Sequence, residues 1–206
     1  MSSFEKEKSE LSRILHKIGA IKFGTFKLAS GRVSPYYIDL RVVPSFPDAF
    51  QRVISMYVKL LEKDLGPQSV DRIAGIPTAG IPFASVVAYQ TKKPFTYIRP
   101  KMKLHGRERR IEGILMPGDK VLLIDDVVTT GLSLKKAAEA IRAEGGVVTD
   151  VLVILDREEG GKERLLKDGA KLHYLLTARE AATKLFELGA IEEDQLKTIM
   201  KQAKKK

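Results

Sequence analysis

The chain has 206 residues, carries 36 lysines and arginines against 26 aspartates and glutamates, for a net charge of +10, and is 44% hydrophobic. This length and apolar content predict a folded α/β domain and exclude a disordered chain. The absence of cysteine excludes disulfides, thiol catalysis and cysteine-bound zinc, and only three scattered histidines argue against a histidine-rich metal site.

Charge and hydropathy also limit the possible cellular location and binding partners of the protein. No apolar run approaches the roughly 18 residues of a membrane span, and the first ten residues lack the apolar core of a signal peptide. We therefore expect a cytoplasmic protein that does not bind membranes. A positive charge suits either nucleic acid or an anionic substrate. Basic and aromatic residues are not interleaved as single-stranded RNA binding would require, so we expect no nucleic-acid partner.

The N-terminal part predicts a helix followed by a β-hairpin. Ser2 and Glu5 have the spacing of a capping box, apolar residues then recur at helical spacing, and Gly19 ends the helix. Apolar and polar residues alternate over 21–43, with a turn at Ser30 and the glycine after it. This alternation is typical of a short hairpin.

The predicted hairpin precedes the repeating strand–helix core, and it carries two adjacent aromatic residues, Tyr36 and Tyr37. Such a pair could cover the face of a flat ring. We therefore expect residues 1–43 to form a small hood over a substrate, with a plain hairpin as the alternative.

The next segment predicts a helix capped by Asp48 that stops at Gly66 and is followed by a short strand over 72–76. Gly75 and Gly80 flank a tight turn from this strand into another helix. A helix start after such a turn favours anions. The turn is a second candidate phosphate site, the alternative being an ordinary strand–helix connection.

A strand over 95–98 leads into a long polar connection over 99–119. From Arg99 to Arg110, both included, there are seven basic residues when His105 is counted. Long loops within compact domains are often functional lids. We expect a mobile lid over 99–118 whose cations close on an anion and exclude water; a solvated run of charge is the alternative.

The most informative stretch, 121–133, reads VLLIDDVVTTGLS. Its apolar start predicts a buried parallel strand over 121–124, and the glycine- and hydroxyl-rich turn at a helix start predicts a phosphate cradle. Asp125 and Asp126 would repel phosphate unless they bind Mg²⁺ or sugar hydroxyls. The stretch thus indicates a phosphorylated ribose. A P-loop has little support because the chain has no GxxxxGK[ST] motif.

The remaining chain continues the alternation. Helices are predicted at 134–143, 162–167, 178–188 and 191–203, and strands at 147–155 and 172–176. Arg157 follows the end of a strand, the edge at which open α/β sheets bind ligands. We expect one domain over 1–206 with a mainly parallel, doubly wound sheet.

The stretch 121–133 resembles the phosphoribosyl-pyrophosphate (PRPP) signature of type I phosphoribosyltransferases. FGTFKLASGRVSPYYIDLR, RPKMKLHG and LDREEGG resemble the hood, the mobile loop and the substrate-binding turn of the orotate phosphoribosyltransferase family. The resemblance implies the type I phosphoribosyltransferase fold. It also implies a Mg²⁺-dependent transfer of phosphoribosyl from PRPP to orotate, giving orotidine 5′-monophosphate and pyrophosphate in UMP biosynthesis. It further implies a homodimer in which the lid covers the site of the neighbouring subunit.

Site residues follow from this resemblance by motif match. The residues implied to bind PRPP are Arg99, Lys101, Lys103, His105, Asp125, Asp126, Val127, Val128, Thr129, Thr130, Gly131, Leu132 and Ser133. Those implied to be catalytic are Lys103, His105, Asp125 and Asp126. Those implied to bind orotate are Ser30, Tyr36, Tyr37, Thr129 and Arg157. Asp125 and Asp126 would act on Mg²⁺ indirectly, through ribose hydroxyls or water.

The chain departs from the family pattern at Ala29, Ala79 and Pro100, where the family often has lysine. These departures leave the pyrophosphate contacts and the base preference open. One alternative is therefore a phosphoribosyltransferase for a purine or for uracil. The other is a PRPP-sensing regulator that binds nucleic acid.

Overall fold

A computed structural model describes residues 3–27, 33–99 and 110–204. The α-helices are α1 (Ser3–Lys17), α2 (Pro47–Leu60), α3 (Gly80–Thr91), α4 (Leu132–Ala143), α5 (Gly161–Lys167), α6 (Ala178–Glu187) and α7 (Glu193–Lys204). The strands are β1 (Ile21–Lys27), β2 (Val33–Ile38), β3 (Arg72–Gly75), β4 (Phe95–Ile98), β5 (Ile111–Glu112), β6 (Lys120–Val128), β7 (Val147–Asp156) and β8 (Lys171–Thr177). Short helical turns occupy Leu40–Ser45, Leu61–Leu65 and Pro67–Ser69.

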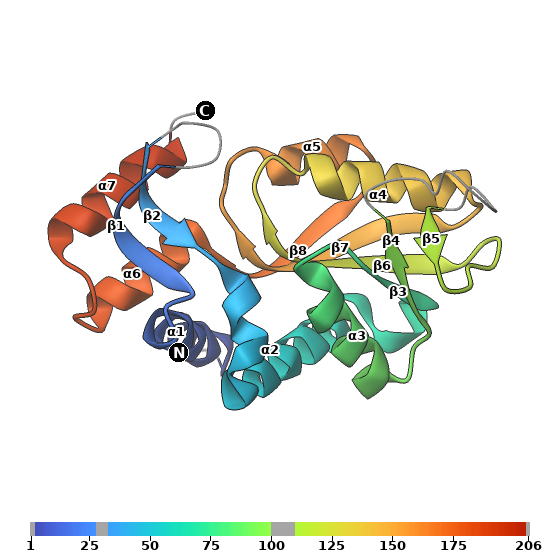
Figure 1. The fold of residues 1–206 in the computed structure, drawn as a ribbon, viewed down its shortest axis with the longest axis horizontal. Coiled ribbons are helices and arrows are strands. Elements are labelled where there is room, and N and C mark those ends of the chain that lie inside the picture. Colours follow the sequence, from blue (N-terminus) through green and yellow to red (C-terminus); the bar gives the residue numbers. More distant parts are fainter. Residues whose placement is uncertain (1–2, 28–32, 100–109, 205–206) are drawn as a thin grey trace.

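The main sheet has six strands in the order β5-β4-β3-β6-β7-β8. All neighbours are parallel except β4 and β5. Helices α2 and α3 cover one face, and α4 and α5 cover the other (Figure 1). The predicted mainly parallel, doubly wound α/β sheet is confirmed. Because β3 and β6 are neighbours, the two predicted anion-binding turns lie at the same edge of the sheet.

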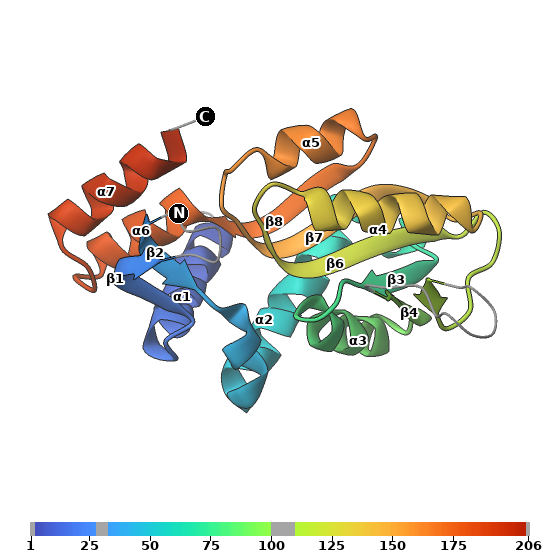
Figure 2. The same ribbon diagram turned by 45° about the horizontal axis from the view of Figure 1, so that its top comes forward.

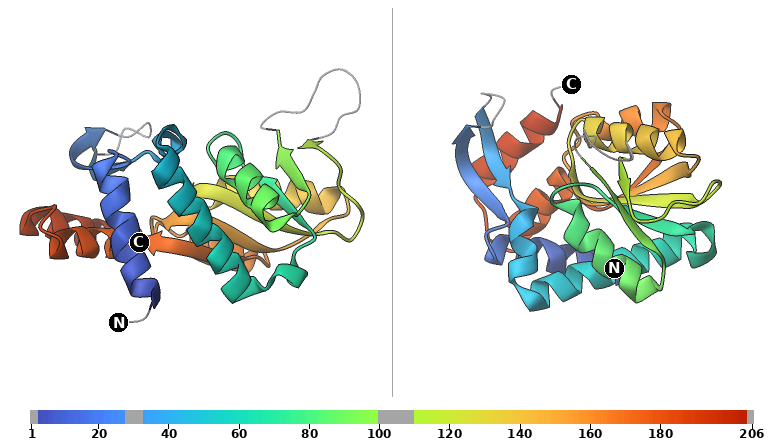
Figure 3. Two further views of the ribbon diagram at one scale, coloured as in Figure 1. Left: turned by 90° about the horizontal axis from the view of Figure 1, so that it is seen from below. Right: turned by 45° about the vertical axis from the view of Figure 1, so that its right-hand side comes forward.

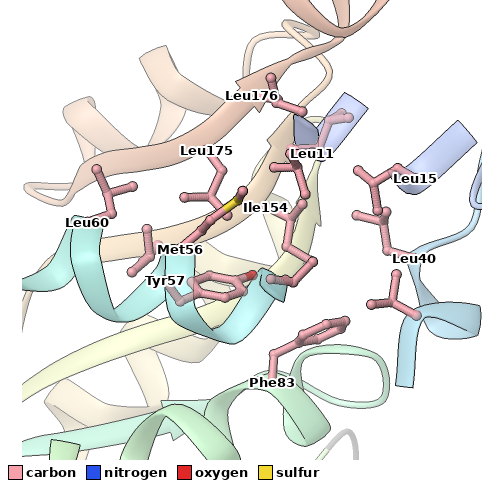
Figure 4. Close-up of a cluster of buried hydrophobic side chains, with 14 of the residues drawn as sticks. Leu11, Leu15, Leu40, Met56, Tyr57, Leu60, Phe83, Ile154, Leu175 and Leu176 are labelled. Atoms are coloured by element: carbon pink, nitrogen blue, oxygen red, sulfur yellow. The ribbon is translucent and has the colours of Figure 1, made fainter. Parts of the chain in front are cut away.

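Both faces of the sheet are buried, and β6 shows how the sequence achieves this. Leu122 and Ile124 belong to the apolar cluster on the α2 and α3 face, whereas Val121 and Leu123 belong to the cluster under α4. Successive side chains of a strand point to opposite faces, so an unbroken apolar run suits a strand covered on both sides. Figure 4 shows part of the first cluster, in which Tyr57 of α2 packs near Ile154 of β7.

The segment predicted to form the hood packs against the C-terminal helices. Strands β1 and β2 form a separate antiparallel pair, and α6 and α7 lie on the same side of the molecule (Figures 2 and 3). Helix α1 packs on α6, where Lys8 pairs with Glu180 and Lys184 lies 3.4 Å from Glu5. The hood expected from residues 1–43 is thus joined by the last two helices.

Three local predictions are corrected. Residues 111–112, assigned to the lid, form strand β5 against β4. Asp48 does not cap α2: Phe46 is the N-cap and Pro47, with its fixed φ, begins the helix. Strand β6 extends to Val128, so both acids lie inside it.

Other sequence expectations concern single features. Ser2 and the Ser30 turn lie outside the described residues. His173, expected to be structural, is buried and lies 2.7 Å from Asp150. No helix within the described ranges is long and apolar enough to cross a membrane.

Candidate functional site

The turn between β6 and α4 forms an open cradle. Gly131 adopts a left-handed φ of 73°, which glycine reaches without strain, and it starts α4 without a side-chain cap. The first N–H groups of α4 therefore remain available to a ligand. A cavity of about 70 Å³ lies here, lined by Asp125 and residues 127–134. Together with the hydroxyls of Thr129, Thr130 and Ser133, this arrangement suits a phosphate group.

The two acids precede this cradle within β6. Asp125 is 8% exposed and Asp126 is 7% exposed. Burial raises the pKa of Asp125 well above that of an ordinary carboxyl group, and the charge of Asp126 adds to the effect. Burial also raises the pKa of Asp126, although the positive charge of Arg41 acts in the opposite direction. Two buried carboxylates side by side favour a ligand that brings positive charge or hydroxyl donors.

The β3–α3 turn packs directly on the first acid. A Cβ atom added at Gly80 would lie 2.7 Å from the Ile124 carbonyl oxygen and 2.8 Å from Oδ1 of Asp125. Glycine is therefore needed for the start of α3 to approach β6 this closely. The positive end of α3 thus lies beside Asp125, which joins the second predicted anion site to the signature strand.

A second cavity, of about 180 Å³, opens between this turn and α4. Its lining residues are Ile76, Pro77, Ile98, Arg99, Arg110, Ser133, Lys136 and Ala137. Arg99 directly follows β4; its backbone N–H donates to the Arg110 carbonyl at 2.7 Å, and its guanidinium pairs with Glu112. The cavity therefore carries three cations, Arg99, Arg110 and Lys136, next to the phosphate cradle.

Arg157 lies on the other side of the cradle. Its backbone N–H donates to the Val128 carbonyl at 3.0 Å, and its guanidinium stacks over the ring of Tyr36 at 5.1 Å from the centroid. Arg157 is 9% exposed and Tyr36 is 3% exposed. Burial raises the pKa of Tyr36, and the charge of Arg157 partly offsets this. The hood thus reaches the sheet through this contact.

The turn that carries Arg157 also touches the phosphate cradle. A Cβ atom added at Gly161 would lie 2.5 Å from Cγ2 of Val128 and 2.7 Å from the Thr129 carbonyl oxygen. The two loops therefore pack backbone to backbone. A ligand held in the cradle lies within reach of the Arg157 turn.

Tyr37 does not lie with Tyr36. Adjacent residues of a strand point to opposite faces, and the Tyr37 ring packs against Phe26 with 5.6 Å between centroids. The Tyr37 hydroxyl accepts a 3.3 Å hydrogen bond from Arg41, which Asp39 holds at 2.7 Å. Instead of stacking with Tyr36, Tyr37 orients the arginine whose charge acts on Asp126.

Several predicted residues are brought together and others cannot be placed. Residues 125–133, Arg99, Arg157 and Tyr36 line or border one region at the carboxyl edge of the sheet. The predicted site residues Ser30, Lys101, Lys103 and His105, like Ala29 and Pro100, lie outside the described residues. Sequence reasoning missed Lys136, although it follows Ser133 by three positions and so shares its helix face. Arg41 and Tyr57 have no comparable spacing from a predicted site residue that could have identified them.

Comparison with known proteins is consistent with this geometry. Residues 45–171 match the phosphoribosyl transferase domain family. The chain is 44% identical to an orotate phosphoribosyltransferase of Cenarchaeum symbiosum over 91% of this chain and 94% of that protein. It superposes on a crystal structure of orotate phosphoribosyltransferase from Aeropyrum pernix with a TM-score of 0.73 and 34% identity, covering 87% of this chain and 99% of that chain. Leishmania donovani UMP synthase gives a TM-score of 0.85 and 32% identity, covering 97% of this chain and 43% of that chain.

Proposed function

Because the chain belongs to the orotate phosphoribosyltransferase family, it transfers phosphoribosyl from PRPP to orotate in pyrimidine biosynthesis, and we propose how its residues do so. In this reaction the bond from ribose C1 to the pyrophosphate oxygen breaks, and C1 bonds to a ring nitrogen of orotate. The observation that carries the assignment is the buried Arg157 packed beside the phosphate cradle. A guanidinium fork suits the carboxylate of orotate.

The cradle holds the 5′-phosphate. The N–H groups at the start of α4 and the hydroxyls of Thr129, Thr130 and Ser133 supply donors around the cavity of about 70 Å³. Val127, Val128 and Leu132 contribute backbone to the same turn. Asp125 and Asp126 then face the ribose, whose hydroxyls donate to the carboxylates.

The acid pair also fits Mg²⁺. Oxygen ligands are those that Mg²⁺ prefers, and it is commonly held by one or two carboxylates together with substrate oxygens. Within the described ranges no cluster of three or more acidic or histidine residues could hold a metal without such help. Asp125 and Asp126 would therefore hold Mg²⁺ through ribose hydroxyls or water. When bound, the ion stabilises charge on the leaving pyrophosphate.

Pyrophosphate lies in the second cavity. Arg99, Arg110 and Lys136 line this cavity of about 180 Å³, together with Ile76 and Pro77 of the segment that leads into α3. The lid residues Lys101, Lys103 and His105 add positive charge when the lid closes. Charge develops on pyrophosphate as the bond breaks, so fixed cations there lower the barrier. Lys136 supplies a positive charge in place of the lysine that the family often has at the position of Ala79.

Orotate lies between the hood and the cradle. Arg157 binds its carboxylate, and the ring of Tyr36, which stacks on the guanidinium, holds the arginine in place. Ser30 and Thr129 contribute polar contacts to the ring, and Tyr37 acts through Arg41. The enzyme works in the cytoplasm as a homodimer in which each lid covers the site of the partner subunit.

One assay tests this assignment. The protein is incubated with PRPP and orotate, adenine or uracil, with and without Mg²⁺, and pyrophosphate release is measured. We expect pyrophosphate release only when both orotate and Mg²⁺ are present with PRPP. Turnover of adenine or uracil without orotate would overturn the base assignment. PRPP binding without any turnover, together with salt-dependent binding of nucleic acid, would favour a regulator instead.

A further inference from the structure

The arginine assigned to orotate is already in contact with a carboxylate of its own chain. Oε1 of Glu159 lies 2.9 Å from Nε of Arg157. The two residues are separated only by Glu158, and both belong to the turn between β7 and α5. The arginine side chain is 10% exposed and that of Glu159 is 25% exposed. The pair therefore has a buried cation and an acid that borders solvent.

This contact lacks the geometry of a good hydrogen bond. Nε and Nη2 of Arg157 and Oε1 of Glu159 are all buried without a hydrogen-bond partner. A buried guanidinium without an acid nearby would be costly, so Glu159 offsets its charge while leaving its donors free. The stacking on Tyr36 holds the guanidinium in place independently of Glu159.

We propose that Glu159 is a stand-in for the substrate carboxylate, which neutralises Arg157 in the free enzyme and is displaced when orotate binds. The inference rests on the assignment of Arg157 to orotate. A planar carboxylate of the substrate can accept two parallel hydrogen bonds from the guanidinium, which Glu159 does not achieve. Glu159 then turns toward solvent, which its partial exposure allows.

The displacement makes Glu159 a determinant of orotate affinity. Orotate binds only the fraction of molecules in which Glu159 has left Arg157, and its apparent dissociation constant is the intrinsic one divided by that fraction. The internal competitor therefore raises the KM for orotate. The same competition excludes ligands that do not bind Arg157 better than Glu159 does. The pair thus lowers the affinity for orotate and raises the selectivity for a base that carries a carboxylate.

The decisive variant is Glu159→Gln, which keeps the shape and removes the charge. We expect the KM for orotate to fall about 3- to 10-fold, with the KM for PRPP unchanged. Glu159→Asp, whose shorter side chain withdraws the carboxylate, should lower it less. A thermal melt gives an independent readout: orotate should raise the Tm of Glu159→Gln more than that of the wild type.

A matched control lies next to it. Glu158 accepts hydrogen bonds from Nε of Arg179 at 2.9 and 3.0 Å, so its carboxylate is paired with a different arginine. Glu158→Gln loses the same charge one residue away and should leave the KM for orotate unchanged. An unchanged or higher KM in Glu159→Gln would overturn the proposal, because it would mean that Glu159 only supports the arginine.

A last variant separates this proposal from the assignment on which it rests. Arg157→Ala should raise the KM for orotate and leave that for PRPP nearly unchanged. If it does so while Glu159→Gln has no effect, only the role of Glu159 fails. If Arg157→Ala leaves the KM for orotate unchanged, the orotate site itself is misassigned and the proposal fails with it.

Discussion

The hydroxyl of Tyr57 donates a 2.6 Å hydrogen bond to the backbone carbonyl oxygen of Asp125. Tyr57 belongs to α2 and is completely buried. Burial raises its pKa well above the ordinary value, and the charges of Asp126 and Asp125 add to the effect, so the hydroxyl stays protonated and donates. The helix under the sheet thus fixes the backbone that carries the acid pair.

Removing this hydroxyl should loosen the acid pair. Tyr57→Phe leaves the Asp125 carbonyl without that donor, which should lower the free energy of unfolding by about 0.5–1.5 kcal/mol. The KM for PRPP should rise while that for orotate changes little. Urea denaturation and steady-state kinetics measure the two effects. Tyr174→Phe on β8 is the matched loss of a hydroxyl away from the acids; an equal rise in its KM for PRPP would contradict the assigned role.

The acid pair itself should be needed for catalysis but not for folding. Asp125→Asn and Asp126→Asn each keep the side-chain shape, and we expect kcat/KM for PRPP to fall at least ~100-fold. Circular dichroism and thermal melts check that the fold persists. The sequence placed these acids at a strand end, whereas they are buried inside β6, so the test depends on amide variants and not on alanine. Unfolding of either variant would mean that the pair is structural.

The same burial predicts how stability depends on pH. The pKa of Asp125 is higher in the folded than in the unfolded chain, so folding favours its protonated form. Its contribution to stability is present below the unfolded pKa of ~4 and is lost as pH rises toward the folded pKa. Asp125→Asn should therefore stabilise the ligand-free protein near pH 7, and the gain should disappear on acidification. A gain in Tm that does not depend on pH would contradict the raised pKa.

Lys136 should contribute to the pyrophosphate site. Lys136→Ala removes one of three cations from the cavity beside the cradle, and we expect the KM for PRPP to rise several-fold. Lys135→Ala is the matched control, because Lys135 lies 3.5 Å from Asp168 and 3.7 Å from Glu139. Equal kinetics for the two variants would remove Lys136 from the site.

Gly80 should be required by both the fold and the site. Gly80→Ala places a methyl group 2.8 Å from Oδ1 of Asp125, and we expect a loss of about 1–3 kcal/mol of stability and a higher KM for PRPP. Gly146→Ala creates a similar overlap, 2.6 Å from Cγ2 of Ile141, at the start of β7. That variant should lose stability without a change in the KM for PRPP. If both raise the KM equally, the effect of Gly80→Ala is merely one of stability.

Complementation tests the proposed shared lid. Lys103→Ala should lower kcat far more than it raises the KM for orotate, and Arg157→Ala should do the reverse. Mixed and refolded together, the two variants should recover part of the activity, because one site of each heterodimer would have an intact Arg157 and an intact lid. Absence of recovery, with subunit exchange verified by size and labelling, would mean that each chain completes its own site.

Much of the sheet followed from periodicity. Long apolar runs such as that of β6 must be buried on both faces, and the alternation with helices then leaves few topologies. Strand β5 was missed because a strand of two residues is too short to show an alternation of apolar and polar residues. The positions of α6 and α7 on the hood were also beyond reach, since an amphipathic helix indicates that a face is buried but does not indicate the partner.

The proposed phosphate cradle could be predicted from the sequence because the residues that would form it are local. Residues 129–133 supply a glycine, hydroxyls and a helix start within one short stretch. Contacts between distant segments could not be read in this way. The proposed roles of Glu159 and Tyr57 depend on the fold, which places them against Arg157 and Asp125. Lys136 was within reach, because its spacing from Ser133 alone puts the two on one helix face.

The joining of α1 to α6 has a consequence for how the chain folds during synthesis. Lys8 and Glu180 are 172 positions apart, and the buried side of α1, with Leu11 and Leu15, lies in one cluster with Leu185. Helix α1 also packs on α2, which follows it closely in the chain, but its contacts with α6 can form only after β8 and α6 have been synthesised. We expect the sheet to form first and the hood to close late, at a rate set by the joining of the two ends of the chain.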